Sequence, residues 1–155
     1  MTLPAGHQVL ASELTALANP TRVGCRLRRV ANQSIASGGS GTAISWDNAD
    51  ENTPSFITVT GATITVPAAS GGGYGITVRC AGAWTTRVFA TINVTSANVG
   101  YPASFREDGN PTDAEVTNGI SLPLLAADSF QVVLFHSTGS NVNVTAWLSC
   151  YLLSP

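Results

Sequence analysis

The chain has 155 residues, enough for one domain with a substantial core. Hydrophobic residues make up 44% and charged residues only 10%, which excludes a disordered chain, and a formal net charge of −2 excludes binding to nucleic acid through a basic surface. Glycine, threonine, serine, asparagine and valine are abundant, and turn-forming residues separate short apolar runs. This composition is typical of an all-β sandwich or barrel.

Residues 1–25 differ from the rest and are predicted to form a short anchoring segment. Four apolar residues have near-helical spacing, Val9, Leu10, Leu14 and Leu17, and four arginines follow, Arg22, Arg26, Arg28 and Arg29. A helix this short is not stable alone. Guanidinium groups suit hydrogen bonding to carboxylates at an interface, although solvated arginines on an opening strand are an equal alternative. No apolar run is long enough for a signal peptide or a membrane span, so we expect synthesis in the cytoplasm and no membrane partner.

From Arg26 onward the apolar residues alternate with period two or form dense short runs. We expect strands at 26–35, 42–47, 55–59, 62–66, 74–82, 85–95, 98–105, 117–124, 129–137 and 141–152. Glycine-rich stretches, such as 37–41 and 70–73, are expected to be turns. The pattern predicts a single β-sandwich over residues 26–155, with Greek-key or jelly-roll connections.

The last two predicted strands are apolar on both faces. Their second faces carry four large residues, Val133, Phe135, Trp147 and Tyr151. A two-layer sandwich buries only one face of each sheet within itself, so we expect these four residues to form a subunit interface on neighbouring strands. The alternative is that the N-terminal segment covers them.

A group of acidic and amide residues follows Trp46: Asp47, Asn48, Asp50, Glu51 and Asn52. An EF-hand loop beginning at Asp47 would need glycine and glutamate where Asn52 and Thr58 stand, so that motif is absent. We expect a solvated surface turn, because aspartate and asparagine favour turns. A looser calcium cage from the same side chains is the alternative.

The sequence contains no recognisable catalytic or cofactor motif, and we expect a protein that is not an enzyme and holds no cofactor or metal. The histidines, His7 and His136, lie in no catalytic pattern. The three cysteines, Cys25, Cys80 and Cys150, lack metal-ligand spacing and are expected to pack as small hydrophobic residues. A competing hypothesis is a carbohydrate-binding or carbohydrate-cleaving groove lined by Trp84, Tyr101, Asp113 and Glu115.

The order of four short motifs resembles the C1q/TNF-like jelly-roll family over Arg26 to Pro155. These motifs are Trp46-Asp47, Ile64 to Pro67, Gly73-Tyr74 and Leu125-Ala126-Ala127-Asp128. The sequence departs from the family at Ala127, where the family usually has glycine, and at Asn93-Val94, where it often has Asn-Gly. The resemblance implies a compact homotrimer in which the loop after Trp46 is an exposed connector.

The leader AGHQVLASELTALANPTR is similar to that of small virion proteins of tailed phages infecting actinobacteria. This resemblance implies a structural protein on the virion surface, a trimeric capsid decoration protein. The anchoring segment, with Val9, Leu10, Leu14, Leu17 and the four arginines, would then bind the major capsid protein. The alternative location is a tail-fibre tip or minor tail protein that contacts other tail proteins and binds host surface glycan.

Overall fold

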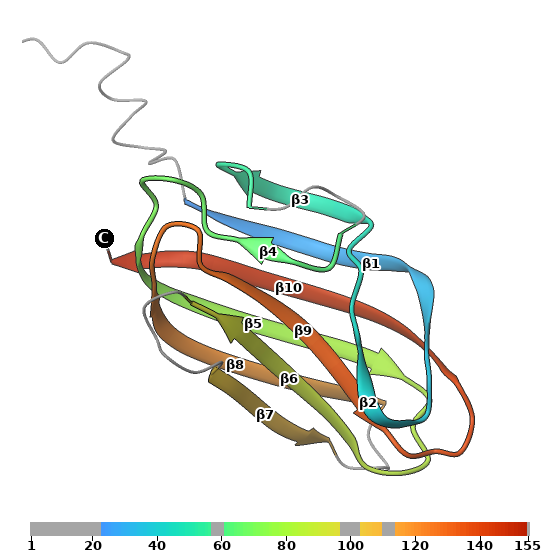
Figure 1. Ribbon diagram of the computed structural model, residues 1–155. Coiled ribbons are helices and arrows are strands. Elements are labelled where there is room, and N and C mark those ends of the chain that lie inside the picture. The colour runs from blue at the N-terminus through green and yellow to red at the C-terminus, as the bar shows by residue number, and fades with distance from the viewer. Residues whose placement is uncertain (1–22, 57–60, 97–102, 110–113, 155) are drawn as a thin grey trace, which may run out of the picture.

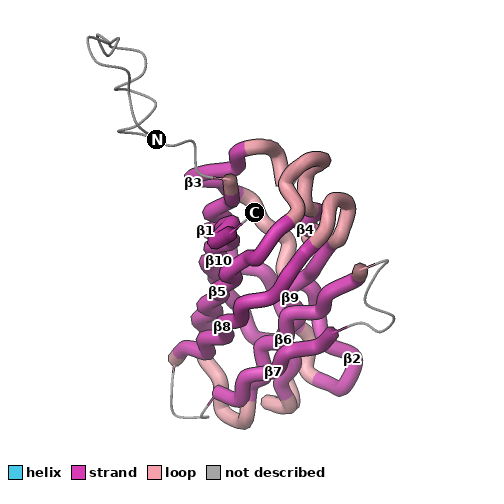
Figure 2. The backbone as a smooth tube through the Cα atoms, turned by 90° about the vertical axis from the view of Figure 1, so that its left-hand side faces the viewer, coloured by secondary structure: helices cyan, strands magenta, loops and turns pink. Residues whose placement is uncertain are grey.

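The computed structural model describes residues 23–56, 61–96, 103–109 and 114–154 (Figure 1). The described residues form two antiparallel sheets that face each other as two layers, as Figure 2 shows. Sheet A has the strand order β3-β1-β10-β5-β8, and sheet B the order β2-β9-β6-β7, with the short β4 also paired to β9. None of the described residues forms a helix that could cross a membrane.

The strands of sheet A are β1 (Gly24–Ile35), β3 (Asn48–Thr53), β5 (Gly72–Gly82), β8 (Glu115–Leu124) and β10 (Val142–Ser154). Those of sheet B are β2 (Gly38–Ala43), β4 (Ile64–Thr65), β6 (Val88–Thr95), β7 (Ala103–Gly109) and β9 (Ser129–His136). The first strand begins at Gly24, two residues before the expected domain start. The all-β jelly roll predicted from the sequence is confirmed.

The core lies between the sheets and is built from the period-two faces of the strands. In β10 the inward side chains from Val142 to Cys150 alternate strictly with outward ones. The thiols of Cys25, Cys80 and Cys150 are fully buried in this core, which confirms that they pack as small hydrophobic residues. Burial raises the pKa of the Cys80 thiol to about 12.

Two buried polar side chains connect the layers. The amide of Asn118 on β8 donates to the carbonyl oxygen of Ala90 on β6, at 2.9 Å. His136, at the end of β9, donates from Nε2 to the carbonyl of Ile35 on β1, at 3.0 Å, and its Nδ1 lies 2.9 Å from the Thr138 hydroxyl. Both ring nitrogens of His136 therefore have protein partners, and this histidine has a structural role.

Two segments that were expected to be turns form strands. The acidic group after Trp46, apart from Asp47, lies on β3 at the edge of sheet A, so the prediction of a surface turn was wrong. Charged side chains are common on edge strands because they oppose further strand pairing, and here they face the arginines of β1. The glycine-rich stretch 37–41 contributes most of β2, at the edge of sheet B.

The sequence also led us to expect that the last two strands are neighbours, and this expectation was wrong. Strand β9 pairs with β2, β4 and β6, whereas β10 pairs with β1 and β5 in the other sheet. The physical reason is the jelly-roll connection, which carries consecutive strands from one sheet to the other. The second faces of β9 and β10 therefore point outward on opposite sides of the sandwich.

The turn between β8 and β9 keeps a left-handed conformation at Ala127, with φ 69°, at the position where the resembled family usually has glycine. Three hydrogen bonds hold this turn. Ala127 N donates to Val66 O at 3.0 Å, and Asp128 accepts from Leu125 N at 2.8 Å through its carboxylate and donates its own N–H to Leu125 O at 3.1 Å.

Replacing Ala127 with glycine is expected to stabilise the protein by about 1 kcal/mol, because an L-residue pays a steric cost at positive φ that glycine does not. Chemical denaturation would measure the change. The matched control is Ala126→Gly in the same turn, where φ is not positive, and it should destabilise. Equal effects of the two substitutions would contradict this account.

Candidate interaction surfaces

The outer face of sheet A carries an exposed aromatic side chain between two arginines. In the register of the sheet, Trp147 on β10 lies between Arg28 on β1 and Arg79 on β5. The Arg79 guanidinium lies 5.1 Å from the centre of the Trp147 ring, a cation–π contact. Trp147 is 39% exposed, so part of its ring is accessible to a partner.

Arg79 is held in place from its other side by Glu115 on β8. Its Nε donates to Glu115 Oε2 at 2.7 Å, and a second guanidinium N–H donates to Oε1, which makes the pair bidentate. The hydrogen bonds to Arg79 lower the pKa of Glu115, and the same bonds raise the pKa of Arg79. This ion pair orients the guanidinium on the Trp147 ring.

Tyr151 and Leu153 extend the same face toward the end of β10. Both lie over glycines: a Cβ added to Gly24 would come within 3.0 Å of the Tyr151 ring, and one added to Gly75 within 3.2 Å of Leu153. The Tyr151 hydroxyl donates to Glu51 Oε2 at 2.6 Å. Burial, followed by this hydrogen bond, raises the pKa of Tyr151, while Arg26 acts in the opposite direction. Leu153 is 66% exposed, so the strip from Trp147 to Leu153 is the apolar part of this face.

The arginines and the acidic group that the sequence showed as separate clusters meet between β1 and β3. Arg28 forms an ion pair with Asp50 at 2.5 Å, and Arg29 forms one with Asp47 at 3.5 Å. Asn52 accepts from the backbone N–H of Phe56 at 2.7 Å. Because the acidic and amide side chains bind separate partners, they do not converge on one point. The described residues contain no group of three or more His, Cys, Asp or Glu that could hold a metal ion.

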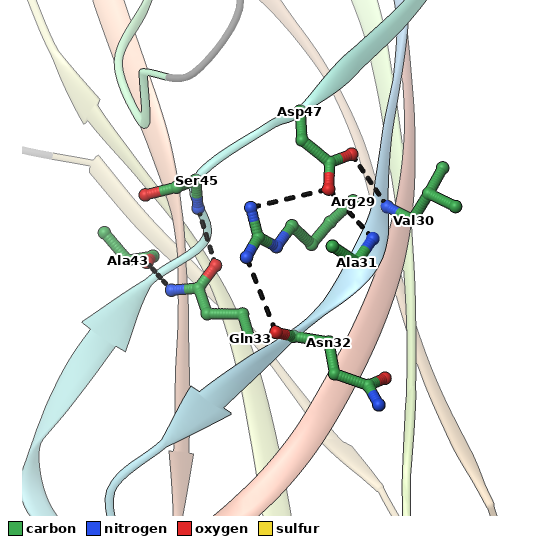
Figure 3. A network of polar contacts seen from close by, with 8 residues as sticks. All are labelled: Arg29, Val30, Ala31, Asn32, Gln33, Ala43, Ser45 and Asp47. Carbon is green, nitrogen blue, oxygen red and sulfur yellow. Dashed lines mark hydrogen bonds and ion pairs between the residues drawn. The ribbon is translucent and has the colours of Figure 1, made fainter.

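Asp47 stabilises an irregularity in β1. The register with β10 shifts between Arg29 and Gln33, which removes residues from the ladder of hydrogen bonds. The Asp47 carboxylate accepts from the N–H groups of Val30 and Ala31, each at 2.8 Å, as Figure 3 shows. These two hydrogen bonds replace those that the interrupted pairing with β10 leaves out.

The Gln33 side chain binds the chain between β2 and β3, a few residues before Asp47. Its amide donates to Ala43 O at 2.7 Å, and its carbonyl oxygen accepts from Ser45 N at 2.8 Å (Figure 3). Gln33 and Asp47 together hold the connection by which the chain passes from sheet B to sheet A.

Replacing Asp47 with asparagine is expected to destabilise the protein by about 1–3 kcal/mol, because one backbone N–H loses its acceptor and Arg29 loses its charge partner. Desolvation raises the pKa of Asp47, but the hydrogen bonds from Val30 and Ala31 and the charge of Arg29 outweigh it, so the pKa lies below its usual value of 3.8. Asp47 therefore contributes its full share of the folding stability above pH 3.8. This contribution is lost as the pH falls through the lower pKa that Asp47 has in the folded protein.

Urea denaturation between pH 2.5 and 7 would test this, with the substituted protein showing a weaker loss of stability in acid. Asp50→Asn is the control, since an exposed ion pair contributes about 0–1 kcal/mol. An unchanged pH profile after substitution of Asp47 would contradict the assigned role.

The outer face of sheet B contains the other two residues of the predicted interface. Val133 is buried and Phe135 is half-buried, and both side chains lie against Gly41 of the edge strand β2. Gly41 has φ 68°, and a Cβ there would lie 2.7 Å from Val133 Cγ1. The same face has a cavity of about 520 Å³ between β2, β6 and β9. The four predicted interface residues therefore do not form one patch.

The competing carbohydrate groove is not assembled among the described residues. Trp84 is buried against Gly82 and lies 5.7 Å from His136, measured between ring centres. Glu115 is bound to Arg79 on the outer face of sheet A. Tyr101 and Asp113 lie outside the described residues, as do Val9, Leu10, Leu14, Leu17, Arg22 and His7 among the other predictions.

The fold is that of a C1q/TNF-like jelly roll. Solved structures similar to this chain include the globular domain of zebrafish complement 1qA protein, with a TM-score of 0.60 and 15% identity, covering 85% of this chain and 98% of that one. The PRD1 vertex protein P5 has a TM-score of 0.63 and 16% identity, covering 86% and 98%. Murine APRIL at pH 5.0 has a TM-score of 0.55 and 15% identity, covering 81% and 98%. No family model and no curated protein matches the sequence.

Proposed function

We propose that this chain is a non-enzymatic structural protein of a phage particle, a trimeric decoration protein on the surface of the head. The observation that carries the proposal is the likeness to the PRD1 vertex protein P5, whose name gives it a structural place on a virus particle. The likeness extends over nearly all of that chain, so it concerns the whole jelly roll and not one motif.

The trimer contact belongs to the outer face of sheet A. This face carries the exposed apolar strip of Trp147, Tyr151 and Leu153, and the ion pair of Arg79 and Glu115 orders its border. Exposed aromatic side chains surrounded by ordered polar groups are typical of the centre and rim of a protein interface. Val133 and Phe135 are left out of the proposed contact because they lie on the other sheet.

The anchor consists of residues 1–22 and Arg26. Arg28 and Arg29 form ion pairs with acidic residues of the domain, whereas Arg26, which lies beside the Tyr151 hydroxyl, is exposed close to the start of β1. In a trimer, three copies of a weakly binding segment act together through their effective concentration, so a short segment suffices for firm attachment. The partner would be the major capsid protein.

Deletion of residues 1–22, which leaves β1 intact, tests this attachment. The shortened protein is expected to stay trimeric by light scattering and to lose cosedimentation with capsids that lack the decoration protein. Binding of the full chain should weaken with rising salt if arginine pairs contribute. Shortened trimers that still coat capsids, or antibody labelling confined to the tail, would contradict the proposal.

A further inference from the structure

The cavity on the outer face of sheet B has an aromatic wall. Phe89 on β6 and Phe135 on β9 are register partners, and both side chains are half-buried. Phe89 is the one large apolar residue on the otherwise polar outer face of its strand. Two adjacent aromatic rings give a surface on which a flat apolar group can stack.

Uncharged polar groups line the rest of the cavity. Thr91 and Asn93 follow Phe89 along β6 at alternate positions, and Ser137 lies at the end of β9. The opposite side is formed by Gly38 and Gly39 of β2, which are exposed. No atom lies within 4 Å of where a Cβ would stand at either glycine, so a ligand could approach this stretch of backbone.

No formal charge is found among the described lining residues. His136, the one titratable residue among these, has both ring nitrogens bound to protein groups. A ligand would therefore be recognised by stacking and by neutral hydrogen bonds, without a charge of its own.

We propose that this cavity is a binding site for a neutral sugar ring, such as a terminal unit of a surface polysaccharide. The C–H face of a pyranose would stack on Phe89 and Phe135, and its hydroxyl groups would bond to Thr91, Asn93 and the backbone of Gly38 and Gly39. The volume of about 520 Å³ lies within the range of small-molecule sites, roughly 300–1,000 Å³. This site lies on sheet B, whereas the proposed trimer contact lies on sheet A, so it does not depend on the proposed function.

Saturation-transfer NMR on the full chain tests the proposal, with methyl glucoside, methyl galactoside, methyl mannoside and N-acetylglucosamine as neutral probes and glucuronate as the charged probe. We expect transfer to the ring protons of at least one neutral sugar and none to glucuronate. Gly39→Leu, at a position with open space and without a left-handed φ, should weaken binding at least tenfold by filling the cavity.

Thr91→Val, which keeps the side-chain volume, should weaken binding severalfold by removing a hydroxyl group. Thr65→Leu on β4 is the matched control for Gly39→Leu and should leave binding unchanged, because Thr65 is exposed and pairs with the other end of β9. Absence of binding by every neutral probe, equal binding of glucuronate, or unchanged binding after Gly39→Leu would overturn the proposal. So would a change of oligomeric state in Gly39→Leu, which would show that a second copy occupies the cavity.

Discussion

Replacing Trp147 with lysine is expected to convert the proposed trimer into folded monomers. Trp147 lies between Arg28 and Arg79, so a lysine there would make a row of three cations on a surface that must lose its water on assembly. An unpaired charge buried in this way costs several kcal/mol, about 3–5 for each copy. An aspartate would be a weaker test, because both arginines could neutralise it.

Light scattering coupled to size-exclusion chromatography would measure the change, and circular dichroism would show that the β-sandwich persists. Val30→Lys is the matched control, since Val30 is also an apolar residue of sheet A and is 57% exposed. It lies on the irregular part of β1, where the register with β10 is interrupted, and it is not part of the strip from Trp147 to Leu153 on β10. If Trp147→Lys remains trimeric, or if Val30→Lys dissociates equally, the assigned contact face is wrong.

Replacing Trp46 with alanine is expected to cost about 3–5 kcal/mol of the free energy of unfolding, the usual range for a fully buried large aromatic residue. Its backbone N–H also donates to Gly61 O at 2.9 Å, in the connection between the two sheets. Since such domains are stable by about 5–15 kcal/mol, the protein should remain folded but melt at a clearly lower temperature.

Trp46→Phe separates loss of volume from loss of hydrogen bonding. The indole N–H of Trp46 is buried and has no hydrogen-bond partner in the described part of the chain, so phenylalanine removes volume without breaking a bond. We expect it to cost less than half as much as alanine in urea denaturation. Equal costs would show that the indole N–H has a partner.

The inward faces of the strands could be predicted from the sequence because a half-buried strand has a strict period of two. Which strands pair with each other could not be predicted in this way. The alternation in β9 and β10 correctly identified their outward residues, but it contains no information about which strand lies beside which. Consecutive strands often pair, and in this fold the connection crosses between the sheets instead.

The strands that were missed are those whose residues have low strand propensity. Aspartate, asparagine and glycine favour turns, so β3 and residues 38–41 of β2 were predicted as turns. Both are edge strands, and pairing with a neighbouring strand stabilises them despite the low strand propensity of their residues. In β3, for example, the acidic residues face the arginines of β1. The sequence showed both charge clusters but not their pairing.

The cavity on sheet B could not be predicted from the sequence because its walls come from three strands far apart in the chain. Two signals were present, namely the lone Phe89 on a polar face and the run of glycines near Gly38. These features come together only because β6 and β2 both pair with β9, one on each side of it.

The pairing of β1 with β10 in the middle of sheet A determines when this protein can fold. The hydrogen bond between Ser34 on β1 and Asn141, directly before β10, joins residues that are 107 positions apart. A growing chain cannot complete sheet A, or bury β1 from both sides, until β10 has been synthesised. Folding is therefore expected to follow translation, and a chain that stops before β10 would expose the apolar inner faces of β1 and β5 to aggregation or proteolysis.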